Sequence, residues 1–234
     1  MLYGQFIPGV NNGREIGLIE TLRLRWVPDA ISLLEGSEAM TDEVMSGAKQ
    51  WFADYAHWFK TSDFGIAELN ATNNHGTWAE AQVAYYAAYA GDGDTVREMA
   101  DRAPGRSAMQ IEPDGTQPHE LKRTLALNYT EFNLRGFTEL AVLAEEIDID
   151  LWNYTTPDGR GLRVAFDFAL PYIAQQKDWP YQQISPAQRK HDTFAQSLRR
   201  AASAYDDPRF EEAIAALDGL TDTGRVFLDL LIAL

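Results

Sequence analysis

Apolar residues recur at a helical spacing along nearly the whole chain, and this periodicity limits the fold more than any other feature of the sequence. Only residues 109–112 alternate as a strand does. The pattern predicts helices over residues 17–34, 42–60, 76–90, 92–102, 118–147, 160–175, 186–204, 208–217 and 222–233. Helices joined by polar loops favour an all-α stack of antiparallel hairpins. No linker is visible, so we expect one domain over residues 1–234.

Several residues predict where these helices begin and end. Thr41 is a good N-cap for the helix at 42–60, and Gly36 and Gly91 are expected to end the helices that precede them. Pro104 is expected to stop the helix at 92–102, because proline removes a backbone donor. The long helix at 118–147 is expected to bend around Asn128.

Composition excludes several classes of protein. The chain has no cysteine, which rules out a thiolate metal site and a cysteine nucleophile. Its formal net charge of −15 argues against nucleic acid and anionic membranes as partners. No apolar run approaches the ~20 residues that a membrane span needs. The first residues lack the features of a secretory signal, so we expect a cytoplasmic protein or one whose beginning has been lost.

The first segment rich in candidate catalytic and binding groups is ELNATNNHGTW, residues 68–78. It places a carboxylate, amides, the imidazole of His75 and the indole of Trp78 at the entrance of a helix. Asn73 or Asn74 taken alone is more simply read as a helix cap, and a histidine in a first turn is often a surface residue. The density of polar groups favours a functional site.

A second pair of interest is Arg123 and Tyr129, which lie six residues apart. A straight helix would turn them about 240° away from each other. The two side chains can therefore share a site only if the helix breaks or bends between them. Otherwise Tyr129 is a packing aromatic and Arg123 a solvated charge.

The segments named so far, together with others, resemble the alginate-lyase superfamily of polysaccharide lyases. The resemblance rests on Tyr3-Gly4-Gln5, Gly13-Arg14, Asn73-Asn74-His75-Gly76-Thr77-Trp78, Arg123-Thr124, Tyr129, Phe132-Asn133-Leu134, Asp150-Leu151-Trp152, Leu170-Pro171-Tyr172 and Trp179-Pro180. No single segment is specific, but the ordered set covers nearly the whole chain. The interval of six residues between Arg123 and Tyr129, and the position of Glu68 seven residues before His75, look more like polysaccharide lyase family 38 than family 5.

The resemblance implies an (α/α) toroid and a periplasmic or secreted enzyme. Members usually carry further N-terminal helices before the Tyr-Gly-Gln segment, so we expect an incomplete toroid. Such a fold would expose apolar helix faces, so we expect either that a partner chain covers them, with self-association as one route, or that the ring stays open.

The resemblance also implies an activity: β-elimination on a uronic-acid polymer, alginate or glucuronan, that leaves an unsaturated uronate end. The implied catalytic residues are Asn74, His75, Arg123, Tyr129 and Glu68. The implied substrate-binding residues are Gln5, Arg14, Asn73, Trp78, Gln117 and Lys122. No metal or other cofactor is required, because amide, imidazole and guanidinium groups together can neutralise the substrate carboxylate. A polyanionic substrate also leads us to expect Arg14, His119, Lys122 and Arg123 near the site, despite the acidic total.

Each catalytic residue has a role suited to its chemistry. Asn74, His75 and Arg123 can neutralise the carboxylate as charge develops on it. Free tyrosine has a pKa near ~10 and is a poor base until a cation such as Arg123 stabilises the phenolate. Tyr129 can then act as base and acid when proton and leaving group share a face. When they lie on opposite faces, His75 is the natural base, and Glu68 orients His75 or Arg123.

Two alternatives remain open from the sequence. A glycoside hydrolase would need two carboxylates, which Glu68 with Glu120 or Asp114 could supply. A catalytically inactive sugar-binding protein is the other. Only a lyase creates a conjugated double bond, so an ultraviolet assay of the product separates the three.

Overall fold

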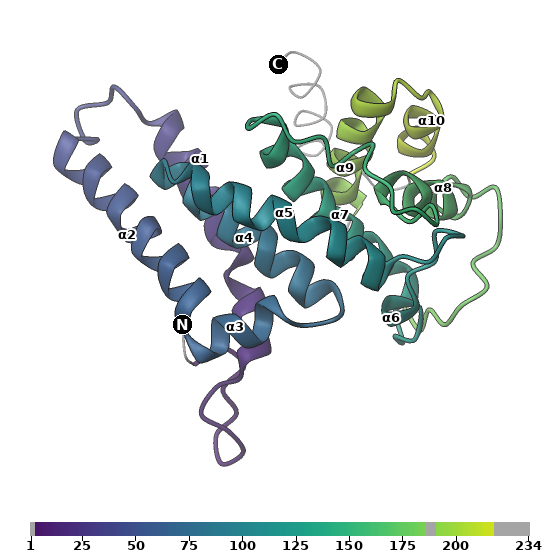
Figure 1. Cartoon of the computed structure of the whole chain (residues 1–234), viewed down its shortest axis with the longest axis horizontal. Coiled ribbons are helices and arrows are strands. Elements are labelled where there is room, and N and C mark those ends of the chain that lie inside the picture. Colours follow the sequence, from purple (N-terminus) through teal and green to yellow (C-terminus); the bar gives the residue numbers. More distant parts are fainter. Residues whose placement is uncertain (1–2, 186–190, 218–234) are drawn as a thin grey trace. The chain divides into compact units, whose positions relative to one another are not determined.

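The computed structural model describes residues 3–185 and 191–217. Helices account for 66% of these residues. They are η1 (Glu15–Arg25), α1 (Trp26–Leu33), α2 (Asp42–Thr61), α3 (Asp63–Leu69), α4 (Asn74–Ala90), α5 (Gly93–Gln110), α6 (Pro118–Leu121), α7 (Ala126–Glu145), α8 (Leu162–Ile173), α9 (His191–Tyr205) and α10 (Arg209–Ala215) (Figure 1). Within the described ranges the β-structure is limited to two isolated bridges, Ile7–Asn11 and Leu125–Gln183. The all-α class predicted from the sequence is confirmed.

Several predicted boundaries are also confirmed. The Thr41 hydroxyl accepts a hydrogen bond from the Val44 N–H at 3.3 Å and begins α2. Gly91 ends α4 in the left-handed region, with φ of 83°. The predicted helix at 222–233 and residues 186–190 of the predicted helix at 186–204 lie outside the described residues.

Three predictions about the helices were wrong in detail. Residues 17–34 form two elements, the 3-10 helix η1 and then α1. The helix expected to stop at Pro104 continues to Gln110, because Arg106 and Gln110 are buried and their packing offsets the cost of an internal proline. The helix expected over 118–147 is interrupted at residues 122–125, between α6 and α7, and not at Asn128.

The chain divides into two compact units. The first comprises Met1–Arg102 and Val142–Ile149, and the second comprises Ala103–Ala141 and Asp150–Leu234. Helices α5 and α7 contribute residues to both units. The expectation of a single toroid domain stays a prediction.

The core of the first unit is aromatic where α2 packs against α4 (Figure 1). The Tyr86 ring lies 5.4 Å from that of Phe52 and 5.2 Å from that of Tyr55. The Tyr86 hydroxyl donates to the Thr21 carbonyl at 2.6 Å, so this buried phenol is satisfied. Burial raises the pKa of Tyr55 to about 12. The two phenols are therefore neutral structural groups.

A close approach of α3 to α2 positions the first part of the candidate site. A Cβ atom at Gly65 would lie 1.7 Å from the Phe59 carbonyl oxygen, so only glycine fits there. The Ser62 hydroxyl accepts from the Gly65 N–H at 3.1 Å and caps α3. This turn delivers Glu68 to the end of α3, where its side chain is fully buried.

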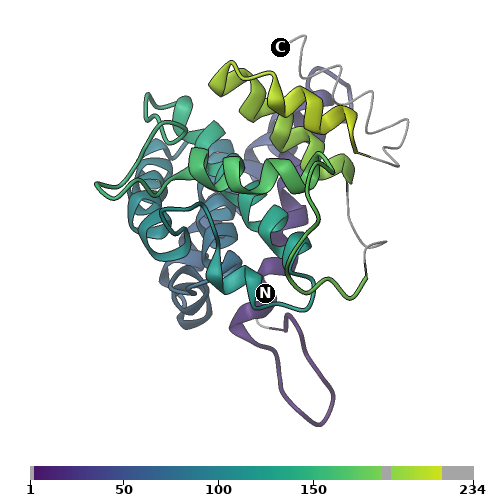
Figure 2. The ribbon, with the colours of Figure 1, turned by 90° about the vertical axis from the view of Figure 1, so that its right-hand side faces the viewer.

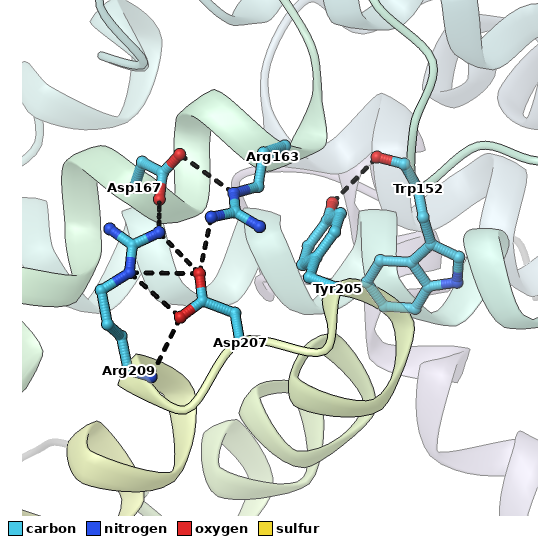
Figure 3. Close-up of polar contacts among 6 residues, drawn as sticks. All are labelled: Trp152, Arg163, Asp167, Tyr205, Asp207 and Arg209. Carbon is cyan, nitrogen blue, oxygen red and sulfur yellow. Dashed lines mark hydrogen bonds and ion pairs between the residues drawn. The ribbon is translucent and has the colours of Figure 1, made fainter.

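In the second unit, an ion-pair cluster joins α8 to α10 (Figure 3). Asp207 accepts hydrogen bonds from Arg209 and Arg163, each at 2.6 Å, and Asp167 pairs with Arg209 at 2.7 Å. The hydrogen bonds from Arg209 hold the pKa of Asp207 well below its usual range. The cluster lies beside an apolar contact of 5.4 Å between the Phe166 and Phe210 rings.

Large apolar side chains are exposed on the helices of the first unit. On α1, the turn that follows it and α2, these are Trp26, Val27, Leu33, Leu34, Val44 and Trp51. Exposed apolar surface of this kind was expected, and self-association through it stays a prediction. Among the described helices, none has the length and apolar character needed to cross a membrane.

Candidate active site

A carboxylate–imidazole pair forms where α3 leads into α4 in the first unit. The Nδ1 atom of His75 lies 2.8 Å from Oε1 of Glu68. The backbone of His75 is held as well, because the Asn73 side chain caps α4 by accepting from the His75 N–H at 3.2 Å. The capping reading of Asn73 and the orienting contact expected of Glu68 are both present.

This arrangement suits His75 to proton transfer. A carboxylate only accepts hydrogen bonds, so Nδ1 carries the hydrogen and Nε2 is the ring nitrogen that can take a proton. The Glu68 side chain is fully buried, whereas 15% of the His75 side chain is exposed. Glu68 can therefore orient the ring, while His75 keeps contact with solvent.

Arg102, which was not among the predicted site residues, supports the same turn. Its guanidinium donates to the Leu69 carbonyl at 2.9 Å and to Glu80 Oε1 at 2.9 Å. The carbonyl belongs to the last residue of α3, directly after Glu68. Arg102 thus ties α5 to the backbone beside the Glu68–His75 pair. No local motif indicates this contact, because it joins residues more than thirty positions apart.

Two neighbours of His75 are buried. The Asn74 side chain is fully buried at the first position of α4. Trp78 is 1% exposed, and the guanidinium carbon of Arg25 lies 5.4 Å from the centroid of its ring. The catalytic role of Asn74 and the substrate contact of Trp78 both stay predictions.

Residues 3–14, which include Gln5 and Arg14, precede η1 as a non-helical segment, and this segment forms a loop that projects from the helices of the first unit (Figure 2). Its base is closed by contact between Gly4 and Gly17, where a Cβ atom at Gly17 would lie 2.3 Å from the Gly4 backbone. The Arg14 N–H donates to the Gly4 carbonyl at 2.9 Å. The Arg14 side chain is exposed and Gln5 is partly exposed, which suits the predicted role of both in binding substrate.

The second unit holds the arginine–tyrosine pair. The guanidinium carbon of Arg123 lies 3.7 Å from the centroid of the Tyr129 ring, a close cation–π contact. The two residues meet because the helix breaks at residues 122–125 and α7 begins at Ala126. The break that helix geometry requires for these two side chains to meet is therefore present. Both side chains are partly exposed, so neither is simply a core residue or a solvated charge.

Other predicted residues of the second unit differ in exposure. Lys122 is exposed in the turn after α6, and His119 is partly exposed on α6. Gln117 is fully buried, and its Oε1 accepts from Asn133 at 2.7 Å. Lys122 is free to meet an anionic ligand, whereas the predicted substrate contact of Gln117 stays a prediction.

The structure thus brings together two pairs of the predicted catalytic residues, Glu68 with His75 and Arg123 with Tyr129. The pairs belong to different units, and their joint action stays a prediction. Within residues 3–185 and 191–217, no group of three or more His, Asp or Glu side chains is placed to hold a metal ion.

An all-α fold with a carboxylate–histidine pair and an arginine–tyrosine pair agrees with the class of helical polysaccharide lyases. The family model described as alginate lyase matches residues 1–179. The chain therefore belongs to the alginate lyase family. No protein with a curated function showed significant sequence similarity to it.

A solved structure is also similar. It is the crystal structure of an alginate lyase from Bacteroides ovatus, with a TM-score of 0.88 and 37% sequence identity over 97% of this chain. The match agrees with the all-α toroid class. This chain spans 61% of the length of that protein chain.

Proposed function

We propose that this protein is a polysaccharide lyase that cleaves a uronic-acid polymer, alginate or glucuronan, by β-elimination. Membership of the alginate lyase family supports the reaction class. The observation that carries the proposal is the contact between Arg123 and Tyr129, because it places a fixed cation against a phenol. The proposal assigns proton transfer to this phenol, and the guanidinium lies over its ring.

The proposed reaction begins at C5 of the uronate. A base takes the C5 proton, the electron pair forms the C4–C5 double bond, and the bond from C4 to the glycosidic oxygen breaks. The oxygen takes a proton, and water is not consumed. Charge develops on the neighbouring carboxylate, so hydrogen-bond donors and cations at that group lower the barrier.

In the proposed mechanism Tyr129 transfers protons, and Arg123 supports both the phenolate and the substrate carboxylate. His75, oriented by Glu68 at 2.8 Å, is the base for sugars whose C5 proton and leaving group lie on opposite faces. Asn74 neutralises the carboxylate together with them. A positioned acid–base group contributes typically ~10²–10⁴-fold to the rate.

We further propose that Gln5, Arg14, Asn73, Trp78, Gln117 and Lys122 contribute to substrate binding. The sequence intervals support assignment to polysaccharide lyase family 38, and the family relationship supports a periplasmic or secreted location. Fractionation of cells that express the natural gene tests the location directly.

The hydrolase alternative is weaker. An acid catalyst of a glycosidase needs a raised pKa, so that it can protonate the leaving group. The pKa of Asp114 is instead lowered by hydrogen bonds from the Thr116 side chain and backbone. Glu68 is engaged by His75. These features favour carboxylates that stay ionised or orient other groups.

A product assay tests the proposal. Purified protein is incubated with polymannuronate, polyguluronate and glucuronan, and the ultraviolet absorbance of the unsaturated uronate is followed together with the reducing ends. A lyase gives both signals in equal number. Reducing ends without absorbance would identify a hydrolase, and binding without either signal would identify an inactive sugar-binding protein.

A further inference from the structure

A short segment of the second unit, residues 182–184, holds the helix break that separates Arg123 from Tyr129. The Ile184 N–H donates to the Thr124 carbonyl at 3.0 Å, and the Ala126 N–H donates to the Gln182 carbonyl at 3.0 Å. The segment is thus bonded on both sides of the Leu125–Gln183 bridge. Thr124 directly follows Arg123, so the place of the arginine depends on this pairing.

The side chain of Gln183 also connects to α7. Its Oε1 accepts from the Leu127 N–H at 3.1 Å, and its Nε2 donates to the Asn128 side-chain oxygen. Nε2 also lies 3.3 Å from the Ser185 carbonyl oxygen. The first N–H groups of a helix have no partner within the helix and need one from outside. Gln183 supplies such a partner to the N–H of Leu127, which lies two residues before Tyr129.

Gln183 is suited to this role by its size as well as its polarity. It is partly buried, and its amide both accepts and donates toward adjacent residues of the same helical turn. Loss of the bond to Leu127 removes the side-chain partner of a backbone N–H in the first turn and lets the start of α7 shift. A shift there moves Tyr129 relative to Arg123, whose guanidinium carbon lies only 3.7 Å from the ring.

We propose that Gln183 is a positioning residue for the elimination, holding the start of α7 so that Tyr129 stays beneath Arg123. The inference rests on the proposed lyase function. Gln183 acts through the pair and does not itself touch the reacting atoms. Displacement of a catalytic group by about 1 Å can cost ~10²-fold in rate, so we expect the loss of Gln183 to lower kcat.

The test compares Gln183→Met with Gln176→Met in the full chain. Methionine has a similar length but makes neither hydrogen bond, and Gln176 has an exposed side chain on the same loop. We expect Gln183→Met to lower kcat at least ~10-fold with KM within about twofold, and Gln176→Met to match wild type. Turnover is measured per folded molecule on the best of the three polyuronates. Equal kcat values for the two variants would overturn the inference.

Two further variants separate positioning from folding. Gln183→Glu keeps the acceptor for the Leu127 N–H and should retain most of the turnover that Gln183→Met loses. If Gln183→Met does not fold, Gln183→Asn replaces it, because its shorter amide cannot span to Leu127. Loss of kcat in this variant supports the inference, and normal kcat overturns it.

Combination with Tyr129→Phe gives the sharpest readout. If Gln183 acts through Tyr129, Gln183→Met should cost little further turnover once the phenol is gone, so the two effects are not additive. Additive losses would overturn the inference. A wild-type protein that releases no unsaturated product from any polymer would instead refute the proposed function itself.

Discussion

The guanidinium carbon of Arg123 lies 3.7 Å from the centroid of the Tyr129 ring, across a break in the helical sequence. Six residues of continuous helix would have turned these side chains apart. The interruption at residues 122–125 therefore brings a permanent cation, Arg123, against the phenol of Tyr129. Both residues keep partial exposure, which a substrate requires.

Replacement of Arg123 by lysine tests whether turnover depends on the planar guanidinium that covers the Tyr129 ring, or on its charge alone. Arg123→Lys keeps the charge but loses the flat group that covers the ring. We expect kcat to fall by ~10–10²-fold, and Arg123→Gln, which also loses the charge, to fall further. Initial rates of product absorbance measure both. Arg200→Lys is the control in the same unit, and an Arg123→Lys enzyme as active as this control would show that charge alone suffices.

The His75 prediction depends on the substrate. His75→Asn removes the proposed base for sugars whose proton and leaving group lie on opposite faces, so turnover on these should drop by at least ~10²-fold. The loss of turnover should be milder on sugars whose proton and leaving group lie on the same face, where Tyr129 acts as both base and acid. Rates on polymannuronate, polyguluronate and glucuronan give the comparison. His57→Asn, at an exposed position of α2, serves as the control. A uniform loss across all three polymers would argue that His75 neutralises the carboxylate and is not a base.

The ion-pair cluster of α8 and α10 predicts a pH-dependent stability. The pKa of Asp207 is lower in the folded protein than in the unfolded chain, where it is 3.8. The ionised Asp207 therefore contributes its full share to the free energy of unfolding above pH 3.8, and this contribution is lost as the pH falls through the folded-state pKa. Asp207→Asn should therefore lower the free energy of unfolding by about 1–2 kcal/mol at pH 7, allowing for the partial exposure of Arg209. The deficit should shrink below pH 4.

Urea unfolding at pH 7 and pH 3 checks this prediction, with Asp206→Asn as the matched control. Asp206 carries the same charge at the next position, is exposed and has φ of 47°, a conformation that asparagine tolerates. An Asp207→Asn deficit that is the same at both pH values would show that packing, and not the ion pairs, joins the two helices.

Much of the helical framework follows from local signals. The cap at Thr41 and the stop at Gly91 were predictable because each depends on a few adjacent residues. The continuation of α5 through Pro104 was not, because it depends on burial of side chains further along the helix. Tertiary packing outweighs a local preference there.

In the candidate site, too, contacts set by nearby residues could be predicted, whereas contacts between distant segments could not. The contact between Glu68 and His75 was anticipated as one of two alternatives, because the family resemblance implied that Glu68 orients His75 or Arg123. The need for a break between Arg123 and Tyr129 also followed from helix geometry, although its place was predicted at the wrong residue. Gln183 could not be predicted, because it lies 56 positions from Leu127 and no local motif marks it.

The central claim is tested most directly by Tyr129→Phe. This substitution removes only the phenolic oxygen, so the ring beneath Arg123 should remain while proton transfer is lost. We predict that kcat on the best polyuronate falls by at least ~10²-fold with little change in affinity for the polymer, because the lost interaction belongs to the transition state. Product absorbance is compared for wild type and variant at equal concentrations of folded protein. Near-normal turnover of Tyr129→Phe would contradict the proposal and make Tyr129 a packing residue.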